Sequence, residues 1–243
     1  MTAMGILFCA MSAVSATPNQ VVLTDVEHVT VYYESGRFGG WPANHGIWIW
    51  DNEILVGYGR GYYKDLGSRH HIDREKPEEH WLARSLDGGS TWRLEHPAEK
   101  GYLIPEGEAL HGIETPGLAT KPTTACPGGI NFVHPQFAMT VRMNSANSGI
   151  SRFYYSYDKG KNWEGPFGLP NFDAPGTATR TDYIVEDEDS CMVFGTAAKQ
   201  DAKEGRVYCI RTDDGGKSWQ FVSYIGEEMK QDGYFGIMPS SVR

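Results

Sequence analysis

Apolar and aromatic residues occur along the chain in short runs, and Gly, Pro, Asn, Asp or Ser separate one run from the next. Runs of about 4–8 residues between such turn residues are typical of β-strands rather than of helices. Three runs span residues 80–84, 152–155 and 206–211, and a longer strand-like stretch precedes each, at residues 46–58, 131–142 and 181–196. The pattern predicts an all-β protein.

A polar motif follows each of the three runs, at residues 85–92, 156–163 and 212–219. Its pattern is S/T-x-D-x-G-x-(T/N/S)-W, and we call these three segments the turn repeats. Asp and Ser side chains bind nearby backbone N–H groups, Gly supplies a positive φ, and the Trp can fold back as an apolar plug. The motif therefore predicts a hairpin, and the repeating unit reads strand, strand, strand, turn, strand.

Four-stranded units repeated along one chain are the sequence signature of a β-propeller. The turn repeats resemble the Asp-box, or BNR repeat, of the sialidase (neuraminidase) superfamily. The resemblance implies a sialidase-like six-bladed β-propeller with the boxes at the periphery of the blades. The chain accounts for about the first three blades and the start of the fourth. We therefore expect an N-terminal fragment that is inactive alone and prone to self-association; closure by two half-rings is the alternative.

The first residues of the chain differ from the rest. The apolar stretch at residues 4–16 is shorter than the ~20 residues that span a bilayer, and small residues at its end precede Thr17. This predicts a weak signal peptide at residues 1–16 and a partial propeller domain at residues 17–243, with a buried strand as the alternative for the first segment. The protein is expected to be secreted or periplasmic, with no membrane association after signal removal.

The charge balance and the spacing of the histidines argue against several classes of partner and cofactor. Asp and Glu number 31 against 22 Lys and Arg, for a net charge of -9, which disfavours a nucleic-acid partner. The histidines do not follow a spaced metal-binding pattern, so neither a metal nor another cofactor is expected. The sequence leaves open whether Cys126, Cys191 and Cys209 are paired or free.

Polar and aromatic residues gather where the inner strand of each unit is expected to begin, at residues 37–46, 131–136, 179–183 and 234–243. Inner strand starts line the axis of a propeller, so these stretches predict a polar central pocket. Its candidate substrate-binding residues are Arg37, Trp41, Asn44, His45, His134, Arg180, Asp182 and Arg243.

The resemblance to sialidases implies roles for some of these residues. Sialidases hold a substrate carboxylate with three arginines, and Arg37 matches the first by position, with Arg180 and Arg243 as candidates for the others. Asp73 lies on the loop that carries the family's catalytic acid/base, so Arg37 and Asp73 are the catalytic candidates. A surface ion pair for Arg37, a solvated loop for Asp73 and an Asp182–Arg180 ion pair are the structural alternatives. The family's Tyr nucleophile and its Glu are expected in the later blades.

The favoured function is an exo-acting glycoside hydrolase, exo-sialidase-like, that removes terminal acidic sugars from glycans. The sequence around Arg37 continues as Phe38-Gly39-Gly40 instead of the family's Arg-Ile-Pro context. A propeller glycosidase or lyase acting on another sugar therefore remains an alternative. A non-catalytic carbohydrate-binding or protein-interaction propeller is the rival from a different class.

Overall fold

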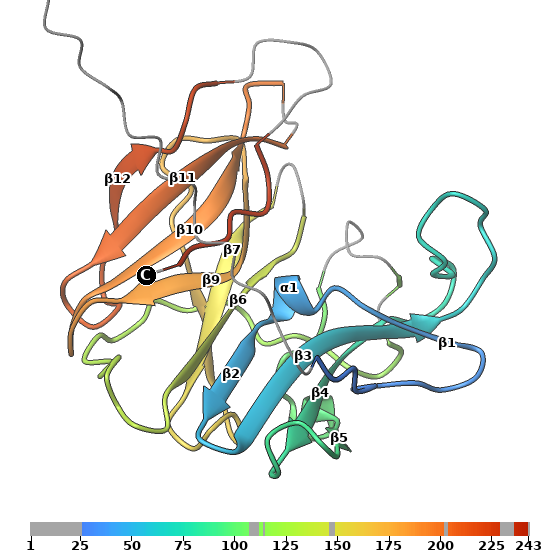
Figure 1. The fold of residues 1–243 in the computed structure, drawn as a ribbon. Helices are drawn as coiled ribbons and strands as arrows, with labels where there is room; N and C mark the ends of the chain where they lie inside the picture. The colour runs from blue at the N-terminus through green and yellow to red at the C-terminus, as the bar shows by residue number, and fades with distance from the viewer. Residues whose placement is uncertain are drawn as a thin grey trace, which may run out of the picture.

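A computed structural model describes residues 26–106, 112–113, 115–145, 149–201, 204–228 and 236–242 of the protein. The predicted signal peptide at residues 1–16 and the candidate Arg243 lie outside the described residues. Within them the protein is all-β, and its strands form antiparallel sheets of which none closes into a barrel (Figure 1).

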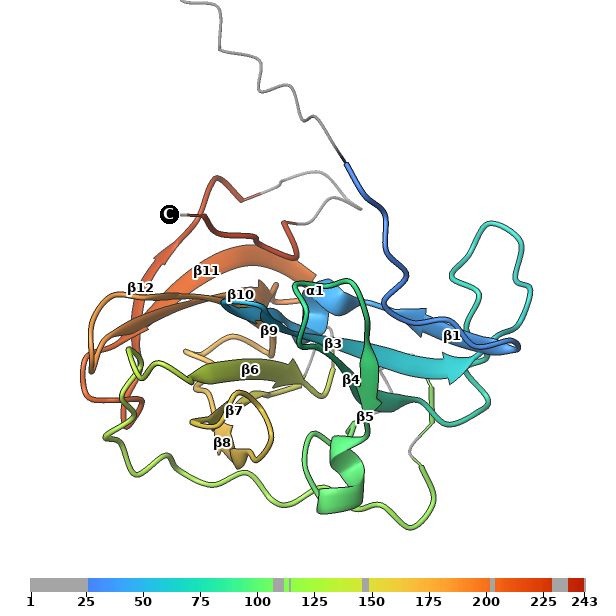
Figure 2. The same cartoon turned by 60° about the horizontal axis from the view of Figure 1, so that its bottom comes forward.

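Three sheets lie beside one another, and each is built from one consecutive part of the chain (Figures 1 and 2). The first sheet contains β1 (Arg37–Gly40), β2 (Ile47–Trp50), β3 (Glu53–Tyr62), β4 (Glu79–Ser85) and β5 (Arg93–Glu95). The second contains β6 (Ala138–Met143), β7 (Ser151–Ser156) and β8 (Glu164–Gly168). The third contains β9 (Thr177–Val185), β10 (Cys191–Ala198), β11 (Glu204–Thr212) and β12 (Gln220–Tyr224). Two short helical turns, α1 (Pro42–His45) and η1 (Pro97–Lys100), interrupt the connections.

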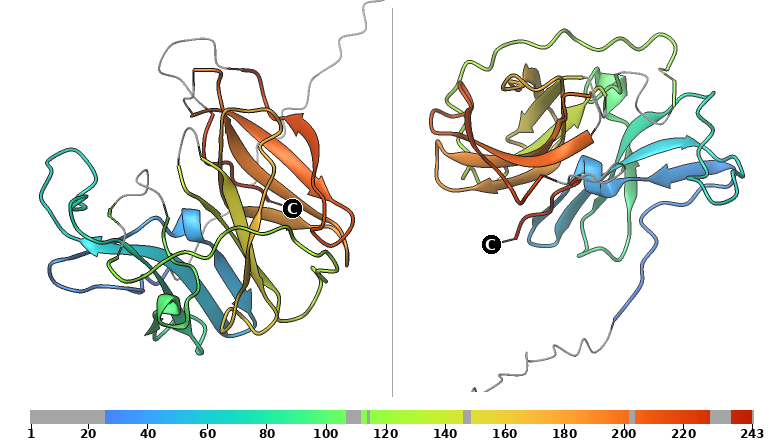
Figure 3. Two further views of the ribbon diagram at one scale, coloured as in Figure 1. Left: turned by 180° about the vertical axis from the view of Figure 1, so that it is seen from behind. Right: turned by 90° about the horizontal axis from the view of Figure 1, so that it is seen from above.

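The inner edge of the first sheet is a broken strand. The long strand β3 pairs with β1 over its second half, where Arg37 lies opposite Tyr62, and with β2 over its first half, where Ile47 lies opposite Val56. The turn α1 fills the break and lies at the centre of the molecule, next to β6 and β9 (Figure 3). Gly57 of β3 makes room for this turn, because a Cβ there would lie 2.7 Å from the Cβ of His45.

The second sheet departs from the predicted four-stranded unit. The stretch at residues 131–142 forms only one strand of the described sheet, β6, instead of two. The preceding chain runs along the outer side of this sheet, where Thr124 forms a bridge with Phe167 of β8. The innermost strand of the second sheet, β6, therefore occupies the place in its unit that β3 and β10 occupy in theirs. It runs in the opposite direction to β2 and β9, the inner strands of the other two sheets.

Each turn repeat joins two antiparallel strands, as the sequence predicts. The three repeats use the same hydrogen bonds. The carboxylates of Asp87, Asp158 and Asp214 each accept the backbone N–H of the residue four positions further on, at 2.9 Å in every case. The side chain of that residue donates to the second carboxylate oxygen at 2.6 Å in all three repeats.

Two of the three turn-repeat tryptophans pack against the sheet that precedes them in sequence. Trp163 of the second repeat is buried in the cluster of Trp48 and Leu55, with its ring centroid 5.9 Å from that of Trp48. Trp219 of the third repeat lies 5.8 Å from Phe153 of β7. Trp92 of the first repeat is partly exposed and donates its indole N–H to Gly89 of its own turn. The second and third tryptophans therefore hold neighbouring sheets together.

A buried ion-pair network reinforces the contact between the first and second sheets. The guanidinium of Arg84 binds Glu95 at 2.7 Å and Glu53 at 2.7 Å. It also donates to the carbonyl of Lys159, whose ammonium group binds Glu53 at 2.7 Å. The Arg84 side chain is only 1% exposed, and these partners compensate its buried charge.

The three cysteines in the described part of the chain are free and buried. Cys209 lies opposite Phe194 in the register of β10 and β11, so it does not face Cys191 across the sheet. Burial raises the pKa of the Cys191 thiol, which makes this thiol unreactive.

We expect Trp163→Ala to lower the free energy of unfolding by about 3–5 kcal/mol, because it opens a cavity between two sheets. The matched variant Trp92→Ala removes a partly exposed tryptophan whose indole binds its own turn, and it should cost about 1 kcal/mol. Chemical denaturation monitored by far-ultraviolet circular dichroism measures both. Equal losses would contradict the role given to Trp163.

The turn repeats also predict a loss of stability in acid. Hydrogen bonds, that from the Thr91 hydroxyl first, lower the pKa of Asp87 to about 2, and the Ser218 hydroxyl lowers the pKa of Asp214. A carboxyl whose pKa is lower in the folded state stabilises the fold above its unfolded pKa and loses that effect as the pH falls through its folded pKa. We expect the Tm to fall between about pH 4 and pH 2, and less steeply in Asp87→Asn. A Tm that does not change over this range would refute the prediction.

Candidate functional site

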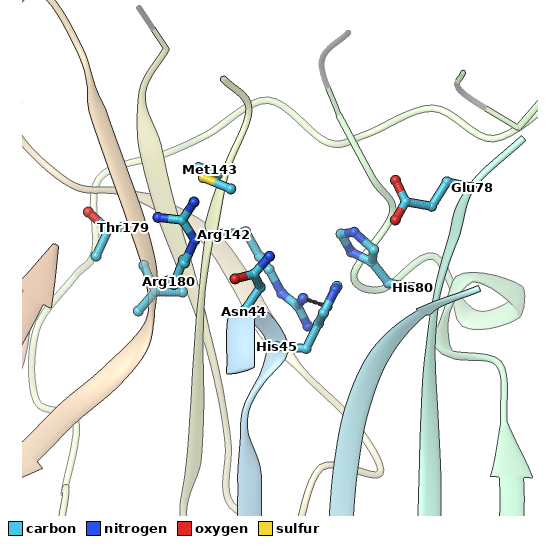
Figure 4. A pocket seen from close by; sticks show the side chains of 9 residues that line it. Asn44, His45, Glu78, His80, Arg142, Met143, Thr179 and Arg180 are labelled. Carbon is cyan, nitrogen blue, oxygen red and sulfur yellow. Dashed lines mark hydrogen bonds between the residues drawn. The ribbon is translucent and has the colours of Figure 1, made fainter. Parts of the chain in front are cut away.

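A small polar cavity lies where the three sheets meet around α1 (Figure 4). Its volume is about 20 Å³, room for one water-sized group. The cavity is lined by Asn44, His45, Glu78, His80, Val141, Arg142, Met143, Thr179 and Arg180. Glu78 and His80 form one wall, Thr179 and Arg180 of β9 form the opposite wall, and β6 and α1 lie between them.

Two threonine hydroxyls fix the strands around the cavity. The hydroxyl of Thr181 in β9 accepts the backbone N–H of Val141 in β6 at 3.1 Å. It also donates to the carbonyl of His45 at 3.1 Å, and the hydroxyl of Thr140 reaches the same carbonyl at 3.0 Å. These bonds tie α1, β6 and β9 together and place His45 beside Arg142.

Arg142 is the most unusual side chain of the site. It is buried, with 5% of its surface exposed, and its Nη1 donates to Nδ1 of His45. Its Nε and Nη2 atoms have no hydrogen-bond partner within the described residues. Burial lowers the pKa of the Arg142 guanidinium to about 9, so the group still carries its charge at neutral pH. A buried cation without a compensating anion is costly, and such a group is a candidate binding site for an anion.

Two imidazole rings and one carboxylate complete the cavity. The rings of His45 and His80 meet edge to face, with centroids 4.5 Å apart. Glu78 is buried and is the one carboxylate among the residues that line the cavity. Gly59 of β3 lies below it, because a Cβ at that position would lie 2.5 Å from Oε1 of Glu78. The site thus combines cationic groups with groups able to give or take a proton.

The structure brings together only some of the residues predicted from the sequence. Asn44, His45 and Arg180 line the cavity. Asp182 follows on β9 but accepts hydrogen bonds from the backbone and the hydroxyl of Ser241, at 3.1 and 2.7 Å. No ion pair between Asp182 and Arg180 is found among the described residues.

His134 does not line the cavity. It precedes β6, whereas the cavity is lined by Val141, Arg142 and Met143 at the other end of this strand. The His134 ring lies against Tyr157 of the second turn repeat, with centroids 4.7 Å apart. The sequence-based prediction for His134 requires the inner strands of all units to run in the same direction, but β6 runs in the opposite direction.

The two catalytic candidates lie together but outside the cavity. The Arg37 guanidinium stacks on the Tyr62 ring at 3.9 Å, and its Nη2 lies 3.9 Å from Oε2 of Glu79. Asp73, whose backbone N–H donates to the carbonyl of Tyr62, is buried and lies 3.5 Å from the Lys64 ammonium. Opposite charges are thus close to both groups, and neither lines the cavity that Arg180 and His45 share.

The sequence interpretation missed Arg142, Glu78 and His80. Arg142 ends a strand-like stretch and His80 begins one, so the sequence pattern indicates only that both lie in strands and gives neither a chemical role. The signal that could have revealed Arg142 is the second unit, which has one strand fewer than the others. With one strand missing, its inner strand β6 runs in the opposite direction, and the end of this strand lies at the axis.

Other kinds of site find no support in the described residues. They contain no group of three or more His, Cys, Asp and Glu side chains that could hold a metal ion. None of the helices described is long and apolar enough to cross a bilayer.

The comparisons with known proteins add little. No protein-family model matches the chain. A solved structure titled as a new family of polysaccharide lyase, PL25 ulvan lyase, matches 79% of this chain with a TM-score of 0.37 and 11% sequence identity. The match covers 42% of that lyase, so the present chain spans less than half of its length. A TM-score this low does not establish a common fold.

Arg142 and Arg84 form a natural pair for a stability test, because both are buried but, among the described residues, only Arg84 has carboxylate partners. We expect Arg84→Met to lower the free energy of unfolding by about 3–5 kcal/mol, since it leaves Glu53 and Glu95 uncompensated. Arg142→Met removes an uncompensated charge and should leave the Tm unchanged or raise it. Thermal unfolding at neutral pH compares the two. A large loss of stability in Arg142→Met would show that the described residues already satisfy its charge.

Proposed function

We propose that the protein is an exported carbohydrate-active enzyme with a sialidase-like propeller, and that it acts on glycans containing acidic sugars. The central cavity binds the carboxylate of one such sugar. The observation that carries the proposal is the buried guanidinium of Arg142, whose Nε and Nη2 find no partner among the described residues.

The geometry of Arg142 suits a carboxylate. Its Nη1 is taken by His45, which leaves Nε and Nη2. These two N–H groups lie on one edge of the guanidinium and match the two oxygens of a carboxylate. Arg180 lines the same cavity and supplies a second positive charge. The cavity admits one small group at its base, so a carboxylate enters while the sugar ring stays at the mouth.

The first candidate reaction is hydrolysis of the bond to a terminal acidic sugar such as sialic acid, as the resemblance of the turn repeats to the Asp-box implies. Glu78 is the carboxyl group of the cavity that can protonate the leaving glycosidic oxygen. The bond between the anomeric carbon and that oxygen breaks, and a nucleophile bonds to the anomeric carbon. Water then attacks the same carbon, displaces the nucleophile and releases the free sugar. That nucleophile belongs to later blades in this scheme, and six blades are the ring size we propose.

The second candidate reaction is elimination from a uronic acid, and the paired rings of His45 and His80 beside two arginines favour it. With the carboxylate charge neutralised by Arg142 and Arg180, one imidazole takes the proton from the carbon next to the carboxylate. The electron pair forms a carbon–carbon double bond, and the glycosidic oxygen leaves from the next carbon with a proton from Glu78 or the other imidazole. The ring keeps the double bond and no water is consumed.

Binding tests the proposal directly. We expect the protein to bind N-acetylneuraminic acid or glucuronic acid, and not the neutral sugar glucose, in saturation-transfer NMR. Arg142→Met should reduce the affinity by at least about tenfold because a charge-assisted bidentate contact is lost. The variant Arg93→Ala, which removes an exposed arginine of β5, is the control. Equal binding of neutral and acidic sugars would refute the carboxylate site.

Products separate the two reactions. Hydrolysis of a sialylated oligosaccharide releases free sialic acid, whereas elimination from a polyuronate creates a double bond conjugated to the carboxylate, which absorbs ultraviolet light. Either product should be lost in Arg142→Met. Because the hydrolytic scheme takes its nucleophile from later blades, binding without either product would refute elimination by this chain and would leave hydrolysis to be tested with those blades present.

A further inference from the structure

A second, larger pocket lies on the loop between β3 and β4. Its volume is about 550 Å³, against about 20 Å³ for the central cavity. It is lined by Lys64, Leu66, Ser68, Arg69, His70, Ile72, Asp73, Arg74 and Glu75. A pocket of this size falls within the range that small ligands occupy.

The loop that forms the pocket is held by its own hydrogen bonds. The backbone N–H of Leu66 donates to Nδ1 of His71, and that of Lys64 donates to the carbonyl of His71. Asp73 accepts the N–H of Glu75, and Ile72 is buried beneath the loop against Gly61. A preformed loop binds a ligand without first losing conformational entropy.

The pocket carries cationic groups without partners. Arg69 and Arg74 are exposed, and no ion pair of either guanidinium occurs among the described residues. Lys64 instead pairs with Asp73 and Glu75, at 3.5 and 3.1 Å. The acidic side chains of the pocket thus neutralise the lysine and leave two arginines for a ligand.

An aromatic side chain connects the pocket to the central cavity. Trp41 caps the start of α1 with a positive φ of 57°, a backbone conformation that costs energy for a tryptophan. A Cβ at Gly59 would lie 3.4 Å from Cε3 of Trp41 and 2.5 Å from Oε1 of Glu78, so the indole and the cavity carboxylate lie over the same glycine. The indole also contacts the rings of Phe38 and His70, whose centroids lie 4.8 and 5.7 Å from its own. Aromatic rings of this kind stack on the apolar faces of sugar rings.

We infer that the pocket at residues 64–75 is a second sugar subsite, which binds another carboxylate-bearing sugar of the glycan held in the central cavity. Arg69 and Arg74 bind its carboxylate, and Trp41 contacts the chain between the two sites. This inference rests on the proposed function, and it makes the substrate an acidic oligosaccharide or polysaccharide rather than a single terminal acidic sugar.

Calorimetric titration with glucuronic acid and with a uronic-acid tetrasaccharide tests the inference. We expect the wild-type protein to bind the tetrasaccharide at least about tenfold more tightly than the monosaccharide. The double variant Arg69→Ala/Arg74→Ala should lose this gain and keep the monosaccharide affinity. Both arginines are exposed, and an unchanged Tm confirms that the variant folds. Arg69→Lys/Arg74→Lys should retain part of the gain, because lysine keeps the charge but not the bidentate contact.

Four results overturn the inference. Equal affinity of the wild-type protein for the two ligands refutes the second subsite and leaves the proposed function intact. A parallel loss of both affinities in the double variant shows that the loop supports the central cavity instead of binding sugar. If the control Arg93→Ala loses the same gain in tetrasaccharide affinity, the gain comes from the general surface charge and not from the loop pocket. No binding of either ligand by the wild-type protein refutes the proposed function itself, and the inference with it.

Discussion

The packing of the second and third turn-repeat tryptophans against the preceding sheet is the contact on which the arrangement of the sheets depends. A sheet of three or four short strands has little core of its own and gains stability by covering a neighbour. Trp163 supplies this cover between the first and second sheets, and Trp219 does so between the second and third. The aspartate of each repeat fixes the turn, which gives the tryptophan one orientation. The network of Arg84, Glu53 and Lys159 then sets the first contact, since its charges are satisfied in one arrangement only.

This peripheral packing allows a polar centre. The inner strands meet around α1 without a continuous apolar core between them, and the threonine hydroxyls of β6 and β9 bind the carbonyl of His45 instead. Arg142 is buried there at a cost in stability that contacts elsewhere offset. The division agrees with a general feature of binding proteins, in which rigid packing at one place supports an unsatisfied group at another.

Local chemistry made the strands and turns predictable from the sequence, but not the direction of every inner strand. The turn repeats fix their own hydrogen bonds within eight residues, so their hairpins follow from residue type alone. The stretch at residues 131–142 has the apolar pattern of a strand, yet periodicity does not show whether one strand or two form. That single strand decides whether His134 or Arg142 reaches the cavity. The positions of Glu78 and His80 in the cavity could not be predicted from the sequence either. Their approach to α1 depends on the break between β1 and β2 and on the space left by Gly57 and Gly59.

The charged groups of the two sites differ in a way that bears on function. Opposite charges approach Arg37 and Asp73, at 3.9 Å from Glu79 and 3.5 Å from Lys64, although Nε of Arg37 has no hydrogen-bond partner among the described residues. No carboxylate approaches buried Arg142 within the described residues, whereas Arg69 and Arg74 at the loop pocket form no ion pair there and are exposed to solvent. A paired charge explains structure, whereas an unpaired one in a cavity requires a ligand or remains a cost. Arg37 and Asp73, the catalytic candidates that the family resemblance implies, are the ones with an opposite charge nearby. In the proposed function, an acidic glycan supplies along one chain the carboxylates that would bind Arg142, Arg69 and Arg74.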